Sequence, residues 1–355
     1  MTGADANAIS GPICITGATG FLGSWAVKEA LDAGFEVHAT TRSEGKAGVL
    51  KSLDGAKERL KLFTGCDLMK KGSFDEAISG CPIVLHTASP VFFSDNEDDR
   101  SKLVDPAVQG TQTVLEACAA AGVKKVVLTS STAAVYMAYG RKPAEEPFTE
   151  KDFSPQDVLE EKKNYYALSK LLAERAAWEI AERDGCPFKL SVMNPTYIFG
   201  PVMQGQKPDN VTAKMVSGFF KAESITQISV PLVDVRDVAK AHVLAAKMDL
   251  DWAGWGRRFL LVGATPMQEE IIKVLRDAKT VSATHKNLLP TTLDPSIPPA
   301  VAGHVPPART KMDVSPSTAP PAEGGLSLEY HHMYETVVDT YATADVDANL
   351  QNAAA

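Results

Sequence analysis

A tyrosine and a lysine four positions apart, Tyr166 and Lys170, are the side chains best suited to proton transfer. Residues i and i+4 share one face of a helix, so an ammonium group would lie beside a phenol. A nearby positive charge stabilises phenolate and lowers the phenol pKa from its ordinary value of about 10. Tyr165 competes for the role, but its i+4 neighbour Ser169 carries no charge. The alternative is that Tyr166 and Lys170 merely face the same way.

Three hydroxyl side chains, Ser130, Ser131 and Thr132, follow the expected strand Lys124–Ser130. Ligands of open α/β sheets gather at the carboxyl ends of the strands. A hydroxyl there would hydrogen-bond a substrate oxygen and hold it near the tyrosine. Alternatively, the three residues cap the strand end through local backbone bonds. The spacing does not choose among the three.

A glycine-rich turn separates the apolar run Pro12–Ile15 from a helical stretch that continues through Ser24–Val27. Gly17, Gly20 and Gly23 recur at three-residue intervals. In a dinucleotide site the first glycine permits the turn, the second admits the pyrophosphate, and the third allows close helix packing. The helix start then favours the phosphate charge. An ordinary strand–helix turn is the alternative.

The second apolar run, Phe35–Thr41, ends in Arg42, about twenty residues beyond the first glycines. An NAD site usually places a carboxylate here, whereas arginine suits the 2′-phosphate of NADP. Glu44 comes only two residues later, and Lys46 adds a second positive charge. We therefore expect NADPH. With a nicotinamide bound, Tyr166 would protonate oxygen while hydride reaches carbon, which is carbonyl reduction.

Composition is typical of an enzyme with a large core. The chain has 355 residues, of which 45% are hydrophobic, and its formal net charge is −8. That charge argues against nonspecific binding of nucleic acid. The polar start Met1–Ser10 lacks the features of a signal peptide, and no apolar run would span a membrane. Cytoplasm is the expected location.

The cysteines suggest neither a disulfide framework nor a metal site. Their number is odd, their spacing fits no metal motif, and several lie in apolar runs, so we expect reduced core thiols and no bound metal. They are Cys14, Cys66, Cys81, Cys118 and Cys186.

Strand and helix patterns alternate along the chain, which predicts right-handed crossovers in a doubly wound parallel sheet, the Rossmann fold. Further strands are expected at Arg59–Thr64, Pro82–Thr87, Phe188–Asn194, Val230–Val235 and Arg258–Val262, the last two returning to the same sheet. Helices are expected at Ser73–Ser79, Arg100–Ala121, Tyr165–Asp184, Val238–Met248 and Leu326–Thr340.

This alternation predicts two lobes. Residues 1–194 plus about 229–262 would form the nucleotide-binding domain. A smaller, discontinuous substrate lobe would comprise about 195–228 and 263–340, followed by a tail at 341–355. The proline-rich segment 286–325 is expected to be a surface excursion.

Taken together, Thr16–Gly23, Val127–Ser131 and Tyr166–Lys170 resemble the extended short-chain dehydrogenase/reductases. More narrowly, the chain resembles the group of dihydroflavonol reductases, cinnamoyl-CoA reductases and yeast-type carbonyl reductases. The similarity runs from about residue 12 to about 265, with weaker matches to about 340. Supporting segments are Gly72–Ile78, His86–Pro90, Asp105–Thr111, Ala173–Trp178 and Asp234–Ala239.

The resemblance implies a catalytic triad of Ser131, Tyr166 and Lys170, with Thr132 as the second choice for the hydroxyl. It also implies the NADPH contacts beyond the glycine motif. The full expected cofactor set is Gly17, Thr19, Gly20, Phe21, Leu22, Gly23, Arg42, Lys46, Asp67, Leu68, Thr87, Ala88, Ser89, Tyr166, Lys170 and Pro195.

The chain departs from both plant families at the substrate side. Cinnamoyl-CoA reductases carry an Asn-Trp-Tyr-Cys-Tyr-Gly-Lys block where this chain has Asn164–Lys170. Dihydroflavonol reductases usually carry a substrate-recognising asparagine where Tyr136 stands. Tyr136 would either line a pocket for an aromatic substrate, together with Ser131, or pack against the sheet.

Three functions follow from these observations. The leading one is an NADPH-dependent reductase of an aldehyde, ketone or acyl-CoA thioester with a bulky or phenylpropanoid-like group, acting as monomer or homodimer. The second is a nucleotide-sugar epimerase or dehydratase, which Arg42 disfavours. The third is a non-catalytic NADP(H)-sensing protein, which the intact Ser131, Tyr166 and Lys170 set disfavours.

Overall fold

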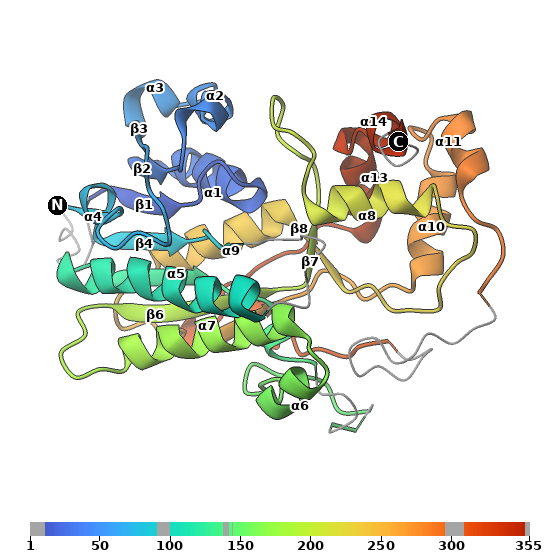
Figure 1. The fold of residues 1–355 in the computed structure, drawn as a ribbon. Helices are drawn as coiled ribbons and strands as arrows, with labels where there is room; N and C mark the ends of the chain where they lie inside the picture. The colour runs from blue at the N-terminus through green and yellow to red at the C-terminus, as the bar shows by residue number, and fades with distance from the viewer. Residues whose placement is uncertain (1–10, 91–99, 138–141, 144, 295–308, 352–355) are drawn as a thin grey trace.

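A seven-stranded parallel sheet organises the computed structural model, which describes residues 11–90, 100–137, 142–143, 145–294 and 309–351 (Figure 1). Its strand order is β3-β2-β1-β4-β5-β6-β9. The order reverses between β1 and β4, and ligands of such sheets bind in the crevice beyond the strand ends at that point. The bounds are β1 Ile13–Thr16, β2 Val37–Thr40, β3 Leu60–Phe63, β4 Ile83–His86, β5 Lys125–Thr129, β6 Lys189–Pro195 and β9 Arg258–Leu261.

Helices cover both faces of this sheet and build the remainder of the molecule (Figure 1). The principal ones are α1 Phe21–Asp32, α5 Arg100–Ala120, α7 Tyr165–Ala181 and α9 Val235–Lys247. Shorter ones near the sheet are α2 Gly48–Lys51, α3 Ala56–Arg59, α4 Asp75–Ile78 and α6 Gln156–Glu161. The others are α8 Val211–Phe219, α10 Gln268–Asp277, α11 Ala283–Leu288, α12 Ser315–Thr318, α13 Met333–Thr343 and α14 Val346–Gln351, with 3₁₀ turns η1 Glu44–Lys46, η2 Thr132–Ala134 and η4 Pro321–Glu323.

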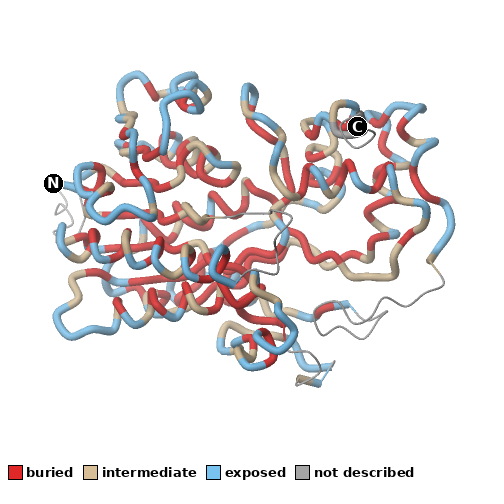
Figure 2. Tube along the Cα trace, in the orientation of Figure 1, coloured by how far each residue is buried: buried red, intermediate tan, exposed pale blue. Residues whose placement is uncertain are grey.

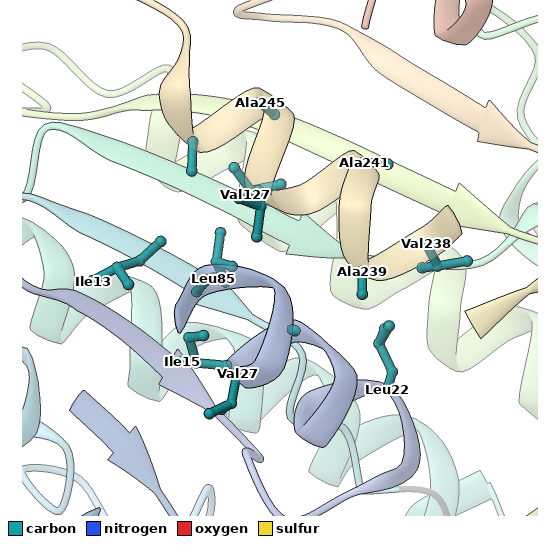
Figure 3. Close-up of a cluster of buried hydrophobic side chains, with 14 of the residues drawn as sticks. Ile13, Ile15, Leu22, Val27, Leu85, Val127, Val238, Ala239, Ala241 and Ala245 are labelled. Carbon is teal, nitrogen blue, oxygen red and sulfur yellow. The ribbon is translucent and has the colours of Figure 1, made fainter. Parts of the chain in front are cut away.

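Successive residues of a strand point to opposite faces of the sheet, and each face packs in its own hydrophobic cluster. Ile13 and Ile15 of β1 pack with α1 and α9, as Figure 3 shows, whereas Cys14 points to the opposite cluster, which includes residues of α5 and α7. Strands buried on both faces are a property of parallel sheets covered by helices. Figure 2 shows the sheet strands buried along most of their length and the exposed residues on outer helix faces and loops.

A second group of elements lies beyond the end of β6. Strand β7 (Tyr197–Phe199) pairs in parallel with β8 (Leu232–Asp234) in a separate two-stranded sheet. Helices α8, α10 and α13 pack beside it around a third hydrophobic cluster that contains Phe199 and Leu232 (Figure 1). The division of the chain into a nucleotide-binding domain and a substrate lobe stays a prediction.

The doubly wound parallel sheet expected from the sequence is confirmed, and its expected strands agree with the structure to within a few residues. One strand assignment is wrong, because Val230–Val235 does not return to the main sheet. Its central part is β8, which ends at Asp234 because that side chain caps α9 by accepting the backbone N–H of Arg236.

The helix expected at Leu326–Thr340 begins later, at Met333, as α13. Residues 326–332 are not helical, because their amides bond to distant segments: Leu328 N–H donates to Ser317 O, and His331 N–H to the Asp237 carboxylate. The described part of the expected tail, 341–351, contains the end of α13 and then α14.

The proline-rich segment 286–325 is only partly described, since residues 295–308 lie outside the described residues. In the described part that follows, 309–325, exposed residues alternate with buried ones, and the surface excursion stays a prediction. Thr310 and Ser317 are buried, and α12 contacts β9. Directly beyond it, Leu326 and Leu328 belong to the cluster on the α1–α9 face of the sheet. The contact of α12 with β9 and the burial of Leu326 and Leu328 fix the end of the segment against the sheet.

Replacing Gly23 by Ala tests the close helix–strand packing. A Cβ there would lie 2.1 Å from the Gly17 carbonyl oxygen, so the backbone would have to shift. We expect Gly23→Ala to lower the free energy of unfolding by about 1–3 kcal/mol, the usual effect of overpacking. Chemical denaturation measures this change. Gly218→Ala is the matched control, because an added Cβ in α8 meets no atom and should stabilise by about 0.5 kcal/mol. Equal stability of Gly23→Ala and the unmodified protein would contradict the packing argument.

Candidate active site

The turn after β1 forms a cradle in which side chains are excluded. Gly17 has a φ of 66°, and a Cβ on it would lie 2.8 Å from Ala88 Cα at the end of β4. Gly23 approaches the Gly17 carbonyl oxygen even more closely. The turn therefore lies directly against α1 and the neighbouring strand, as a pyrophosphate site requires.

The N-terminus of α1 can bind an anion. Gly20 precedes the helix in an extended conformation, no side chain caps it, and its first turn contains no acidic residue. The first N–H groups of a helix have no intrahelical partner, and the helix dipole favours negative charge there. Phe21 and Leu22, both expected to contact the cofactor, lie in this first turn.

Two exposed cations follow β2. The loop is anchored by a hydrogen bond of 3.1 Å between the hydroxyls of Thr19 and Thr41. Arg42 and Lys46 are exposed, and neither forms an ion pair within the described residues. The nearby carboxylate of Glu44 is engaged by Lys51 at 2.8 Å, and this pairing lowers the pKa of Glu44. Arg42 and Lys46 therefore remain available for a phosphate.

Asp67 and Leu68, expected near the adenine, follow β3, and Thr87 follows β4, so all three come after the carboxyl ends of strands. Asp67 is exposed and its carboxylate accepts the backbone N–H of Met69 at 2.9 Å, while Leu68 packs against Gly110 of α5. Thr87 donates its hydroxyl to the Thr16 carbonyl oxygen at 2.6 Å, so β1 and β4 end at the same level.

Lys170 links α7 to the end of β4. Its Nζ donates to the hydroxyl of Ser89 at 2.8 Å and lies 5.8 Å from the centre of the Tyr166 ring. Helix α7 begins at Tyr165, where Asn164 caps it by accepting the Ala167 N–H at 3.2 Å. The structure thus brings Tyr166, Lys170 and Ser89 together at the carboxyl edge of the sheet.

Ser131, rather than Thr132, contacts the tyrosine. Ser131 is buried at the end of β5, and its side chain hydrogen-bonds Tyr166. The Ser131 hydroxyl oxygen also accepts the Ala133 N–H at 3.1 Å, which fixes its position at the start of η2. The Thr132 hydroxyl instead donates to the Pro195 carbonyl oxygen at 3.2 Å. Ser130 is likewise turned away, since it donates to Glu174.

The pKa of Tyr166 contradicts one expectation. We expected Lys170 to lower it, but in the structure it is raised, chiefly by burial and further by the neighbouring Tyr197 phenol, while the Ser131 hydrogen bond lowers it. Tyr166 is 38% exposed as a whole residue, so the desolvation concerns its hydroxyl rather than the ring edge. Burial also lowers the pKa of Lys170 to about 8. Because the Lys170 amine is withdrawn from water, its charged form is less favourable than in solution, even though it donates a hydrogen bond to Ser89.

Tyr136 packs in the core. It is 8% exposed and meets Phe148 edge-on, with ring centres 6.2 Å apart, in a cluster with Leu168 and Leu171 of α7. Packing accounts for its position, and contact with substrate stays a prediction.

Sequence reasoning did not single out two residues that border this site. Tyr197, at the start of β7, is 43% exposed and influences the pKa of Tyr166. Tyr197 lies two residues beyond Pro195, the last residue of β6, and this position at a strand end could have indicated its place in the site. Gln206 donates to the carbonyl oxygens of Thr19 and Gly20 at 3.1 and 3.2 Å, which holds the loop after β7 against the glycine turn. No local pattern signals Gln206.

The described residues were also compared with the requirements of disulfides, metal sites and membrane spans. The five cysteines are free, and within the described residues no group of three or more His, Cys, Asp or Glu side chains could hold a metal. Among those residues, no helix is long and apolar enough to cross a membrane.

Solved structures support the fold. An NADPH complex of Gre2 from Candida albicans superimposes with a TM-score of 0.78 over 95% of this chain and 100% of that one, at 29% sequence identity.

The sequence comparisons identify the family. A cinnamoyl-CoA reductase from Medicago truncatula is 38% identical over 278 residues, which cover 75% of this chain and 80% of the relative. Tetraketide alpha-pyrone reductase 2 from Arabidopsis thaliana is 36% identical over 270 residues, which cover 74% of this chain and 81% of that relative. The model of the NAD dependent epimerase/dehydratase family matches residues 13–252. The resemblance expected from the motifs is confirmed: this chain belongs to the NAD dependent epimerase/dehydratase family, the extended short-chain dehydrogenases/reductases.

Proposed function

We propose that this protein is an NADPH-dependent reductase of a bulky carbonyl compound, with Tyr166 as the proton donor. The observation that carries the proposal is the hydrogen bond between Ser131 and Tyr166 at the sheet edge that also holds Lys170 and the glycine turn. A hydroxyl pair, an ammonium and an anion-binding helix start at one edge suit hydride transfer coupled to protonation of oxygen.

The residues present fit NADPH. The pyrophosphate would lie against the glycine turn and the start of α1, where a Cβ on Gly17 would collide with Ala88. Arg42 would hold the 2′-phosphate, with Lys46 beside it. A bound NADPH supplies the hydride. The relative Gre2 from Candida albicans is described as an NADPH complex, which supports this cofactor.

The chain's own groups would handle the carbonyl oxygen and its proton. Ser131 and Tyr166 would both donate hydrogen bonds to that oxygen, which polarises the carbonyl. The raised pKa of Tyr166 keeps its phenol protonated at neutral pH, as a proton donor for reduction must be. The Lys170 ammonium would stabilise the phenolate left after proton transfer.

We further propose that the substrate is an aldehyde, ketone or acyl-CoA thioester with an aromatic or bulky group. The names of the relatives, a cinnamoyl-CoA reductase and a tetraketide alpha-pyrone reductase, support this class. The exposed aromatic side chains of Tyr166 and Tyr197 next to the hydroxyl pair offer surfaces for such a group.

The experiment that tests this function follows NADPH consumption by the purified protein. The panel contains an aromatic aldehyde, a hydroxycinnamoyl-CoA, a dihydroflavonol and an aliphatic ketone. We expect turnover of at least one aromatic member. Bound NADPH without turnover of any member would favour a sensing role. A nucleotide-sugar is tested separately by product analysis, because an epimerase or dehydratase consumes no net NADPH, and its conversion would favour that function.

Removing the Tyr166 hydroxyl tests the proton donor. We expect Tyr166→Phe to lower turnover about 10²–10⁴-fold, because general-acid catalysis contributes that much, while NADPH affinity is largely retained. Steady-state kinetics and a fluorescence titration with NADPH measure both quantities. Tyr165→Phe, one position earlier on the helix, is the control and should leave turnover unchanged. Full activity of Tyr166→Phe would remove this residue from the mechanism.

Removing the Arg42 guanidinium tests cofactor choice. Arg42→Ala should weaken NADPH binding about ten- to a hundredfold, since a hydrogen bond to a charged group contributes about 1.5–3 kcal/mol, and should affect NADH far less. Titrations with both cofactors give the ratio. Lys57→Ala, an exposed cation on α3, should change neither affinity. Equal losses for NADPH and NADH would defeat the 2′-phosphate assignment.

The pKa of Lys170 predicts a decline of activity at alkaline pH. Its pKa of about 8 means that the ammonium is charged below that pH and neutral above it. Turnover at saturating NADPH should therefore fall as pH rises through about 8, when the charge that stabilises phenolate is lost. Rates measured from about pH 6 to about pH 10 test this. A rate that stays constant up to about pH 10 would exclude Lys170 from this role.

A further inference from the structure

One helical turn beyond Lys170, α7 carries a carboxylate with no access to solvent. Glu174 is 1% exposed, and Arg258 of β9, which is 5% exposed, donates its Nε to Glu174 Oε1. The two residues are 84 positions apart in the chain. This buried ion pair belongs to neither the cofactor set nor the proposed triad.

The Glu174 carboxylate is connected to the backbone of Ser131 through the side chain of Asn194. Glu174 Oε2 accepts the Ser130 hydroxyl at 2.5 Å and the Asn194 side-chain amide at 2.9 Å. The same Asn194 amide donates to the carbonyl oxygen of Ser131 at 3.1 Å. Glu174 therefore holds the end of β5 through two partners, one directly after β5 and one on β6.

The guanidinium of Arg258 holds the other side of the site. Its Nη1 donates to the carbonyl oxygens of Glu150 and Asp152, and its centre lies 3.9 Å from the centre of the Phe153 ring. The next residue, Ser154, donates to the Ala133 carbonyl oxygen at 2.9 Å. The ion pair thus ties the segment 150–154 to the turn that starts at Ser131.

Glu174 and Lys170 also border one small cavity. A cavity of about 20 Å³ is lined by both, together with Ser89, Thr111 and Ser130. Because the two side chains border the same small cavity, a change of charge at Glu174 would be felt at Lys170.

We infer that Glu174 and Arg258 are positioning residues for catalysis, which hold Ser131 against Tyr166 and keep the net charge beside Lys170 at zero. The inference rests on the proposed function. A buried ion pair is often no more stabilising than a well-packed apolar pair, so stability alone does not explain this arrangement.

The charged and titratable groups around Lys170 and Tyr166 are few among the described residues. His86 of β4 faces Lys170, but burial lowers its pKa to about 3, so it is neutral at working pH. Tyr197 of β7 faces Tyr166 and is itself held protonated by a raised pKa. The Glu174–Arg258 pair is therefore the group whose charge balance a substitution can change.

The first test is Glu174→Gln, assayed over pH with the best substrate of the carbonyl panel. Glutamine keeps the size and one of the two accepting oxygens, and it leaves the Arg258 charge unopposed, since arginine does not deprotonate. An added positive charge lowers the pKa of both Lys170 and Tyr166. The alkaline decline of turnover should therefore move to lower pH by about half to one unit, the order of magnitude expected for one added charge in a medium of effective dielectric constant about 20. Glu116→Gln removes the same charge from the exposed pair with Arg183 and should leave the profile unchanged.

The second test is the double variant Glu174→Gln/Arg258→Met, which has no unopposed buried charge. The alkaline decline should return to its original position, because the charge beside Lys170 is again balanced. Turnover should remain about tenfold lower with an unchanged KM for NADPH, because Ser131 is held less firmly while the cofactor site is untouched. This variant gives the answer even where Glu174→Gln alone does not fold.

The outcomes separate this inference from the proposed function. A profile of Glu174→Gln that superimposes on the original, or a double variant with full turnover, would overturn the positioning role while carbonyl reduction still stands. No turnover by the unmodified protein would instead reject the proposed function.

Discussion

The parallel pairing of β1, β4, β5 and β6 is the constraint on which the candidate site depends. Since all four strands run the same way, their carboxyl ends meet at one edge and deliver their following residues to it. The glycine turn, Ser89, Ser131 and Pro195 arrive there from four separate parts of the chain. A slip of one strand by one residue would turn its side chains to the opposite face.

Hydrogen bonds between these strand ends keep them level. The Thr16 hydroxyl bonds the His86 ring at 2.8 Å and accepts the Ala88 N–H at 3.1 Å, which joins β1 to β4. Thr132 joins β5 to β6, and Lys170 joins α7 to β4. Buried polar groups of this kind are stable only when paired, so each bond also restricts where the strand ends can lie. The site is thereby built on rigid elements rather than on free loops.

Local sequence patterns predict part of the candidate site. The glycine spacing, the positive residue after β2 and the Tyr166–Lys170 pair each lie within one element or turn, so sequence spacing predicts them. The Arg258–Glu174 contact joins residues 84 positions apart, and Gln206 reaches the glycine turn from 186 positions away, so no local pattern predicts either. The raised pKa of Tyr166 depends on burial by distant segments. For the same reason residues 326–332, which bond to distant partners, did not form the helix that their composition favours.

In the proposed reaction, hydride passes from NADPH to a carbonyl carbon beside Ser131 and Tyr166. The measurement uses NADPH with both hydrogens of nicotinamide C4 replaced by deuterium, together with an aromatic carbonyl substrate, and analyses the product by mass spectrometry. We expect an alcohol or aldehyde product that carries one deuterium on the former carbonyl carbon. A reduced product without deuterium, or consumption of NADPH with no reduced product, would contradict this hydride transfer.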